Sequence, residues 1–577
     1  MTSCSNDDVT DNGPDSGKAE ATGQKTWAML NFGIGETVTR AAVVGDNGNE
    51  PGKGNDNNVN TIDLYIFDEN DKLELSMTVD NTGGDAGVYD KNMLAPSTPV
   101  EVTSGKKTFC VILNKCGDIE PTKGTTTLSD FLTQQQTITN YAGLIGTEMM
   151  SSSDNLMMTG IKKDVTIHAG ISKEEVTSAR TSATDAEKEA KNVVTLDVNR
   201  NVAKLDLKLD GDGTSLEVKA DASAPKLATL QGVTYQVNNL NKNAYYFLQE
   251  KDANEVYPTP FYTESTGDHW FNQETGGQPA GSTTPLYLTP NTHIQNNAKV
   301  GNTTYTLVKG VYVPEVGEDK YVVNGYDQVN KKFTYSTQAT DLAIDKVSIF
   351  SYDYSVAFTT ISALSSMDLQ ADANLTTAKP HLQALVAKRV AEKYSAEQDI
   401  AAGDVEFLKD KDAYTTVNKE TAGSKVYAYL VPKTYNNGIA NVNKPGHYTI
   451  EMKRWSKKLG ETEASEDKSF NLTPLTIGVY NVVKDSDKTG LQCYYRINTF
   501  TVDFGKAHPM YYSVVRNYSY HVTINSVAQI GDTTDENVDL PGAGEQDKPI
   551  EEATTFMQCS INIYKWIGSD MSVELGK

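Results

Sequence analysis

Side chains suited to covalent or metal chemistry are few in this sequence and widely spaced. None of its 5 cysteines belongs to a C-x-x-C pair, and its 7 histidines are too scattered to complete a zinc site with them. The cysteines are Cys4, Cys110, Cys116, Cys493 and Cys559. Cys110 and Cys559 fall within strand-like runs, where a small buried side chain is the expected role, and a Cys493–Cys559 disulfide stays open. The sequence therefore predicts no metal and no cofactor.

Signatures of enzyme active sites are not found either. The sequence contains no G-x-S-x-G, H-E-x-x-H or Walker A motif, and the Gly-rich GDNGNEPGKGN lacks the Ser or Thr of a phosphate-binding loop. Asp210 and Asp212 resemble the start of a calcium loop but lack its Gly and closing Glu. We therefore expect a protein that is not an enzyme.

Cys4 differs from the other cysteines because its neighbours suggest acylation. It follows Met-Thr-Ser and precedes the acidic, Asn- and Gly-rich stretch SNDDVTDNGPDSGKAEATG. Small residues before a cysteine and a polar tether after it resemble the processing site of a bacterial lipoprotein. We predict lipid attachment at Cys4; the alternative is a free cysteine near an unstructured terminus.

The element around which the sequence is organised is a strand predicted at residues 26–34. Ala28, Leu30, Phe32 and Ile34 alternate with the residues between them, which is typical of a strand with one buried face. A loop rich in Gly, Asn and Asp follows at residues 45–58, and loops of this composition are preferred sites of proteolysis. A sandwich that lost this strand would keep an apolar groove and two unpaired edges.

Length and composition indicate a multidomain, non-helical protein. A chain of 577 residues exceeds one hydrophobic core, so two or more domains are expected. The 30 Tyr, 43 Gly and 22% charged residues accompany no domain-long helical periodicity. The net charge of −24 disfavours nucleic acid or an anionic membrane surface as a partner. No apolar run is long enough to span a bilayer.

Alternating and continuous apolar runs predict strands along most of the chain. The clearest lie at 62–67 and 73–79, joined as a hairpin by an Asp- and Asn-rich turn, and at 109–113, 426–431, 447–453, 479–483, 493–504, 511–527 and 559–563. At 194–198 and 203–209 the alternation changes phase near Arg200 and Asn201, which fits a bulge or a strand that crosses between sheets. Pro380 to Tyr394 reads as a helix that starts at the proline, and residues 251–330 read as surface loops with a binding role. We divide the chain into a leader (1–25), a removable first strand (26–40), an N-terminal sandwich (41–212), a C-terminal sandwich (213–566) and a tail (567–577).

Several segments, in their order along the chain, resemble the fimbrillins of Bacteroidales, which build type V pili. The segments are NTIDLYIFDENDKLE, SGKKTFCVILNKCGD, NLMMTGIKKDVTIHAG, VNRNVAKLDLKL, YYSVVRNYSYHVTINSVAQIG and MQCSINIYKW. Tyr518 stands where the family usually has His. The motifs cover both ends of the chain and leave residues 251–424 poorly covered.

The resemblance implies an all-β protein with two transthyretin-like Greek-key β-sandwiches, carrying loop and short helical insertions. It also implies a lipoprotein precursor at the outer membrane and cell surface, cut by a trypsin-like, Arg-specific protease between the residues at positions Arg40 and Ala41. A cut at Arg180 would make no groove, and a cut at Lys25 would leave the first strand attached. The mature form would lie in extracellular fimbriae.

In the family the first strand leaves with the leader, and a neighbour's C-terminal segment replaces it. The tail suits that role because Met571, Val573 and Leu575 alternate with polar or small residues; an ordinary edge strand is the alternative. The implied partners are other copies in a head-to-tail homopolymer, anchor and tip subunits of the same pilus, the processing protease, and host proteins or glycans. Two other functions stay open: a tip or accessory adhesin that uses residues 251–330, and a monomeric glycan-binding surface lipoprotein.

Overall fold

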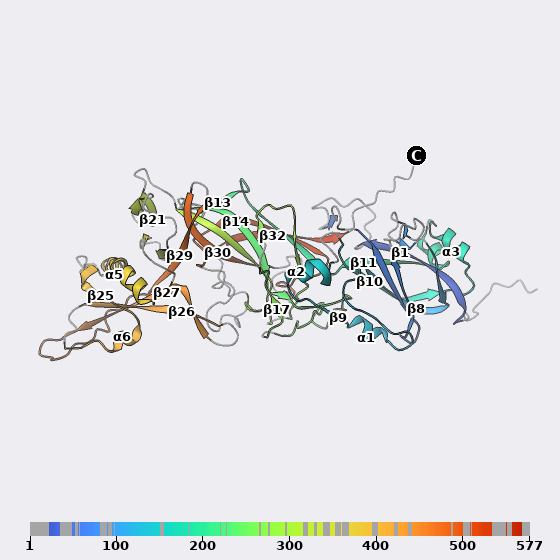
Figure 1. Cartoon of the computed structure of the whole chain (residues 1–577), viewed down its shortest axis with the longest axis horizontal. Helices are drawn as coiled ribbons and strands as arrows, with labels where there is room; N and C mark the ends of the chain where they lie inside the picture. Colours follow the sequence, from blue (N-terminus) through green and yellow to red (C-terminus); the bar gives the residue numbers. More distant parts are fainter. Residues whose placement is uncertain are drawn as a thin grey trace, which may run out of the picture.

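The structure is a computed structural model, and it is dominated by β-strands. It describes residues 22–34, 49–51, 56, 58–80, 89–90, 95–96, 98–150, 155–182, 184–219, 221–224, 226, 228–264, 267–274, 277–294, 297–314, 321–327, 332–338, 347–351, 359–360, 368–394, 402–420, 425–436, 441–485, 488–499, 508, 510–533, 550 and 557–567. The all-β prediction is confirmed. The molecule is elongated, with three units in a row (Figure 1).

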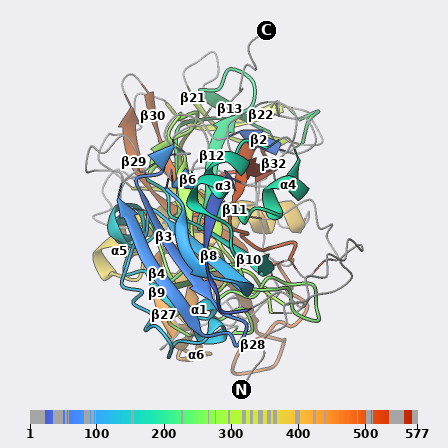
Figure 2. The same ribbon diagram turned by 90° about the vertical axis from the view of Figure 1, so that its right-hand side faces the viewer.

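The first unit is built on a seven-stranded sheet in the order β4-β3-β8-β10-β11-β1-β7. Its strands are β1 (Lys25–Ile34), β3 (Thr61–Phe67), β4 (Leu73–Asp80), β7 (Val100–Thr103), β8 (Gly105–Leu113), β10 (Met158–Ile167) and β11 (Val193–Arg200). Two small strands, β5 (Tyr89–Asp90) and β6 (Ala95–Pro96), pair with each other. Figure 2 views this unit end on.

This sheet folds over on itself and forms the two layers of a sandwich. The layers, β4-β3-β8-β10 and β11-β1-β7, join through only two residue pairs, Met158↔Arg200 and Thr159↔Asn199. At this corner a Cβ on Gly160 would lie 2.4 Å from the carbonyl oxygen of Asp197, so only glycine fits there. Alternate residues of both layers form one buried apolar interior, hereafter the first core.

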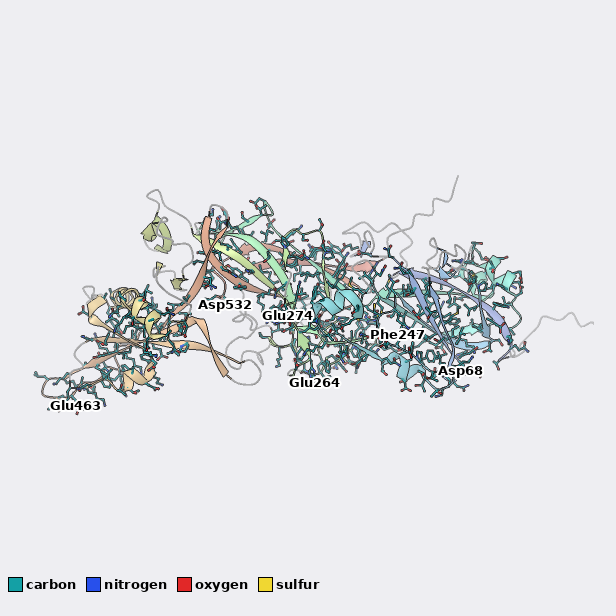
Figure 3. All side chains as sticks on the ribbon, viewed as in Figure 1. Asp68, Phe247, Glu264, Glu274, Glu463 and Asp532 are labelled. Atoms are coloured by element: carbon teal, nitrogen blue, oxygen red, sulfur yellow. The ribbon has the colours of Figure 1, made fainter. Side chains whose placement is uncertain are left out.

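The opposite face of β3 and β8 is covered by a connecting segment of short elements. These are α1 (Leu128–Leu132), β9 (Gln135–Thr137), α2 (Tyr141–Gly143) and the π-helix η2 (Leu144–Glu148). The ring of Phe131 lies 4.7 Å from that of Tyr65 and 5.1 Å from that of Phe247, and Phe247 sits where the first and second units meet (Figure 3). Both units therefore share one continuous core.

The second unit is a larger sandwich formed mainly by later parts of the chain. Its strands are β12 (Ala203–Leu209), β13 (Ser215–Val218), β14 (Ala228–Asn238), β18 (Gln278–Pro279), β19 (Leu286–Leu288), β20 (Tyr305–Pro314), β30 (Lys488–Asn498), β31 (Tyr518–Val527) and β32 (Met557–Ile567). The N-terminal β2 (Asn49–Pro51) joins it by pairing in parallel with β32. Minor pieces are β15 (Leu240–Asn241), β16 (Asn243–Tyr245) and β17 (Trp270–Phe271). β21 (Tyr321–Asp327) and β22 (Lys332–Gln338) follow β20 in the chain and form a two-stranded sheet of their own.

The chain crosses between the two sandwiches before the domain boundary predicted after residue 212, at the place where the alternation of apolar residues changes phase. β12 pairs with β31 and β19 of the second unit, so the change of sheet falls at Asn201 and Val202 instead of after residue 212. Residues 251–330, expected to be surface loops, also include β19 and β20, whose Leu288 and Val308 are fully buried. Because residues 251–330 are rich in Thr and Tyr, the core strand β20 was not recognised from the sequence.

A third unit is inserted between β20 and β30, which pair with each other as a hairpin. It contains β23 (Val347–Ser351), β24 (Thr359–Thr360), β25 (Val405–Leu408), β26 (Val426–Asn436), β27 (Asn441–Ser456), β28 (Ser465–Glu466), β29 (Leu475–Asp485), α5 (Asp372–Lys393), η5 (Ala402–Asp404) and α6 (Lys411–Thr415). It has its own core between α5 and the sheet. Glu463 marks its far end in Figure 3, opposite Asp68 of the first unit.

The predicted helix over residues 380–394 is real but begins earlier. α5 starts at Asp372 and holds Pro380 in its interior. An interior proline costs about 3 kcal/mol because it removes one hydrogen bond and crowds the preceding turn. Buried Ala378 and Leu382 lie on either side of it in the third unit's core, and their packing offsets that cost.

Candidate functional site

β1 is the middle strand of its layer. It pairs in parallel with β11 from Met29↔Val193 to Ile34↔Val198, and antiparallel with β7 from Lys25↔Thr103 to Ala28↔Val100. Among the described strands, β7 pairs with β1 alone. Without β1, therefore, β7 would lose its neighbour and β11 would present an open edge over most of its length.

The apolar face of β1 lies in the first core, as the sequence predicts. Ala28 and Leu30 are each 1% exposed and Phe32 is 7% exposed, and all three belong to the first core. The backbone of Ile34 pairs with Val198, whereas its side chain lies outside the described residues. The observed part of the predicted alternation is thus correct.

The other face of β1 is also covered, which the sequence did not indicate. Met29 is 1% exposed and packs with Val176 and Ala179 of α3 (Lys173–Ala179). A capping box starts α3: Ser172 accepts from the backbone of Glu175, whose side chain accepts from the backbone of Ser172. The short α4 (Asp185–Glu189) follows α3. Both faces of β1 are therefore buried.

A polar cluster holds the N-terminal half of β1. The Asn192 side chain donates from Nδ2 to the carbonyl oxygens of Trp27 at 3.0 Å and His168 at 2.9 Å, and its Oδ1 accepts from the backbone of His168 at 2.7 Å. The Thr26 hydroxyl accepts from the backbone of Ile171 at 3.1 Å. Asn192 is 1% exposed and adopts φ 57°, a left-handed conformation that Asn tolerates better than most residues.

The other predicted site residues lie outside the described part of the chain. They are Cys4 for lipidation, Arg40 and Ala41 for proteolysis, and Met571, Val573 and Leu575 for the donor strand. The structure does place the alternative cleavage sites. Arg180 caps the C-terminal end of α3, is 8% exposed and donates from Nε to Oδ1 of Asn31 at 3.3 Å. Lys25 is open to solvent, with an 81% exposed side chain paired to Glu101.

The remaining arginines of the sequence lie within the folded units. Of these, Arg200, Arg496 and Arg516 are buried, Arg389 is half-buried in α5, and the side chain of Arg454 is 21% exposed. A protease needs an extended, accessible segment, so these positions are poor substrates in the folded chain.

Arg516 joins the first two units, because its guanidinium donates to the hydroxyl of Thr159 in β10 at 3.4 Å. Its guanidinium donates to the carbonyl oxygens of Tyr245 at 2.7 Å and Tyr246 at 3.1 Å. Burial lowers the pKa of Arg516 to about 9. Arg200 is also fully buried. Its Nε donates to the carbonyl oxygen of Asp56 at 3.1 Å. The sequence offered these residues only as parts of resemblance motifs.

An ion-pair network holds β2 on the second unit. His521 bridges two carboxylates, with Nε2 2.7 Å from Glu50 and Nδ1 2.7 Å from Asp206, and Lys204 lies 3.2 Å from Glu50. Burial opposes the charge of Glu50, but the hydrogen bond from His521 and the charge of Lys204 lower its pKa to about 2. Burial also opposes the charge of His521, while Asp206 and Glu50 raise its pKa to about 9.

The cysteines in the described residues are free thiols. Cys110, Cys116 and Cys493 are buried and Cys559 is half-buried, so the Cys493–Cys559 bridge is not formed in this structure. Burial raises the pKa of Cys493 to about 11, which makes it unreactive. No group of three or more potential metal ligands occurs among the described residues.

In the described part of the chain no helix has the length and apolar character needed to cross a membrane.

Two segments of the chain match models of known protein families. Residues 28–200 match the family described as major fimbrial subunit protein (FimA), and residues 489–571 match the family described as major fimbrial subunit protein type IV, fimbrillin, C-terminal. These matches confirm the fimbrillin resemblance. The first match begins within β1 and ends at Arg200, the last residue of β11. The two matches support a pilus subunit with a cell-surface or extracellular location.

Comparison with solved structures gives proteins of Porphyromonas and Parabacteroides, all with TM-scores below 0.5. A fimbrilin (FimA) from Porphyromonas gingivalis has 11% identity and a TM-score of 0.38, covering 95% of this chain and 99% of its own. A cell adhesion protein from Parabacteroides distasonis has 12% identity and a TM-score of 0.38, covering 94% and 100%. The tip fimbrial protein Mfa3 from Porphyromonas gingivalis has 12% identity and a TM-score of 0.27, covering 57% and 94%. Comparison with curated proteins gives no match.

Proposed function

We propose that this chain is the structural subunit of a cell-surface fimbria and polymerises by protease-triggered strand exchange. An Arg-specific, trypsin-like protease cuts between Arg40 and Ala41, the first strand leaves, and the tail of a second copy takes its place. In this proposal Met571, Val573 and Leu575 enter the first core where Ala28, Leu30 and Phe32 were. The observation that carries the proposal is the central, doubly buried position of β1 in its layer.

The position of β1 supports a subunit that stays monomeric until it is cut. While β1 is covalently attached, its effective concentration at its own groove is on the order of mM or higher, so a neighbour's tail competes poorly. Cleavage removes that advantage. The connection that holds Arg40 runs from β1 in the first unit to β2 in the second, so the cut leaves β1 held only by non-covalent contacts.

Three or four apolar side chains inserted by a tail contribute roughly 5–10 kcal/mol before ordering costs. Backbone pairing with β11 and β7 adds direction and register. The contact joins the C-terminal end of one copy to the first unit of the next, so it is heterologous and does not close. It therefore propagates as a filament.

The same proposal assigns the remaining partners. A lipid on Cys4 anchors the precursor in the outer membrane, and the cut at Arg40 releases the chain from that anchor along with β1. Anchor and tip subunits of the same pilus use the same groove and tail. The observation that supports this order is that Cys4 and β1 lie on the same side of Arg40 in the sequence.

Digestion with an Arg-specific protease tests the proposal. The expected result is a new N-terminus at Ala41, followed by SDS-resistant ladders of the cut protein. Deleting residues 568–577 should abolish the ladders and leave the cut unchanged, and Arg40→Ala should abolish both. Normal ladders without the tail would refute the stalk-subunit proposal.

A second candidate is a tip or accessory adhesin of the same pilus. It is favoured by the inserted third unit, which has its own core and lies at the end of the molecule away from β1 (Figure 1). A tip subunit accepts a strand but need not donate one. This candidate would be favoured if the cut protein binds a tail peptide in its groove but never donates its own tail to a second copy. A monomeric glycan-binding lipoprotein would give no ladder and a measurable affinity for polysaccharide.

A further inference from the structure

The two halves of β1 are held unequally. The first half forms backbone hydrogen bonds on both sides. On one side Lys25 to Ala28 pair with β7. On the other side the backbones of Trp27 and Met29 donate to the carbonyl oxygens of Ile171 at 3.2 Å and Asn192 at 3.0 Å. The residues just before it continue this bonding, because the backbone of Ser104 donates to Gln24 at 2.8 Å. We call this end, Gln24 to Met29 with its backbone hydrogen bonds on two sides, the clamp.

The second half, Leu30 to Ile34, is paired on one side only. Its partner is β11, up to Ile34↔Val198. On the opposite side the register with β7 stops at Ala28, and no other described strand pairs with β1 there. β6 lies close to this edge but pairs with β5 alone. Among the described residues, this half of β1 is therefore paired on one side only.

We propose that an extended segment of a second copy enters the groove at the Leu30–Ile34 end and displaces β1 toward Lys25, with Asn192 as the residue that locks the incoming strand in register. The inference rests on the proposed strand exchange and adds a direction and a positioning residue to it.

Local opening explains the direction. A strand end paired on one side loses fewer hydrogen bonds when it frays, so it opens more easily. Ile34 is also the end nearest to Arg40 in the chain, so the cut removes the tether from the half that opens most easily. The incoming strand then gains the edge of β11 before it must compete for the clamp.

The contacts of Asn192 explain the register. Its Nδ2 binds the carbonyl oxygen of Trp27 and not the indole, so any extended strand can present the same group. The bonds of Asn192 to both the carbonyl and the backbone N–H of His168 hold the amide in one orientation. A strand one residue out of register would place a carbonyl on the wrong side, since successive carbonyls alternate in direction along a strand.

Hydrogen–deuterium exchange of the full chain, cut with an Arg-specific protease and mixed with excess peptide of residues 567–577, tests the proposal. We expect the backbone amides of Asn31 and Gly33, which face β11, to lose protection first after the cut, by tenfold or more, while those of Trp27 and Met29 keep theirs until the peptide has bound. Loss of protection first at Trp27 and Met29, or everywhere at once, would overturn the direction.

Two variants separate the locking role from folding. Asn192→Gly keeps the left-handed backbone accessible and should increase peptide dissociation tenfold or more, with the initial association rate unchanged within twofold. Thr195→Ala, at an exposed position on β11, is the control and should change neither rate. An equal effect of Asn192→Gly on association and dissociation would overturn the lock. A peptide that never displaces β1 would overturn strand exchange itself and this inference with it.

Discussion

Leu30→Ala is the substitution that most sharply tests how β1 is retained. Leu30 is 1% exposed in the first core and lies in the half of β1 that pairs only with β11. Its truncation removes apolar contacts without changing the backbone bonds of the clamp. In the uncut chain the tether keeps β1 in place, so the precursor should still be monomeric and folded.

The expected magnitude follows from burial. A fully buried Leu→Ala change costs 2–5 kcal/mol, since the lost transfer energy is increased by the cavity that remains. At about 3 kcal/mol, and with each 1.4 kcal/mol equal to a factor of ten, the affinity of the cut first strand for its groove falls about 100-fold. The loss should appear mainly as faster dissociation, because the association step precedes full burial.

The assay measures how long the fragment ending at Arg40 stays with the cut protein, by size-exclusion chromatography and mass spectrometry. Leu30→Ala should shorten this time about 100-fold and speed ladder formation. Lys25→Ala is the matched control, because this side chain is 81% exposed and forms only a surface ion pair, and it should have no effect. Retention of the Leu30→Ala fragment for as long as the wild-type fragment would refute the account of β1 as a core strand.

Three further predictions concern contacts within and between the units. Asp206 and Glu50 raise the pKa of His521 to about 9. The stability that His521 contributes is therefore complete below about pH 6.5 and is lost as pH rises through 9, by at most about 3 kcal/mol. Thermal melts should show this fall in stability, and His521→Gln should remove the pH dependence. Arg516→Ala removes the side-chain donor to the carbonyl of Tyr245 and one of three donors to that of Tyr246, and should lower the unfolding free energy by 2–5 kcal/mol in urea titrations. Gly160→Ala, crowded by Asp197, should destabilise the first unit more than the second in proteolysis.

The sequence was sufficient for features that depend on local periodicity. The alternation of Ala28, Leu30 and Phe32 predicted a strand with one core face, and the structure confirms the burial of all three. Likewise the hairpin of β3 and β4 follows from two apolar runs joined by an Asp- and Asn-rich turn, in which Asp71 adopts φ 57°. Such patterns depend only on neighbouring residues, so they can be recognised without knowledge of the fold.

Features that depend on distant residues were not predictable in this way. The neighbour of β1 along most of its length is β11, which lies far along the chain. The residues of neither segment indicate that the two strands pair. Asn192 reads as a loop residue, and its role arises only where that loop meets β1. The transfer of β12 to the second sheet follows from its parallel pairing with β31, another long-range contact.

The third unit was missed for a different reason. Its strands and α5 were partly recognised, but their apolar runs are short and separated by polar segments, so they read as decorations of one sandwich. Only the shared core of α5 and its sheet shows a separate unit, and only the pairing of β20 with β30 shows that it is an insertion within a hairpin.

The most direct test of strand exchange mixes two variants that can each perform only one half of it. One lacks residues 568–577 and is cut after Arg40, so it can accept a strand but not donate one. The other carries Arg40→Ala and an intact tail, so it can donate but not accept. The account predicts SDS-resistant dimers containing one copy of each variant and nothing larger. Absence of dimers, or growth of longer ladders from this mixture, would contradict it.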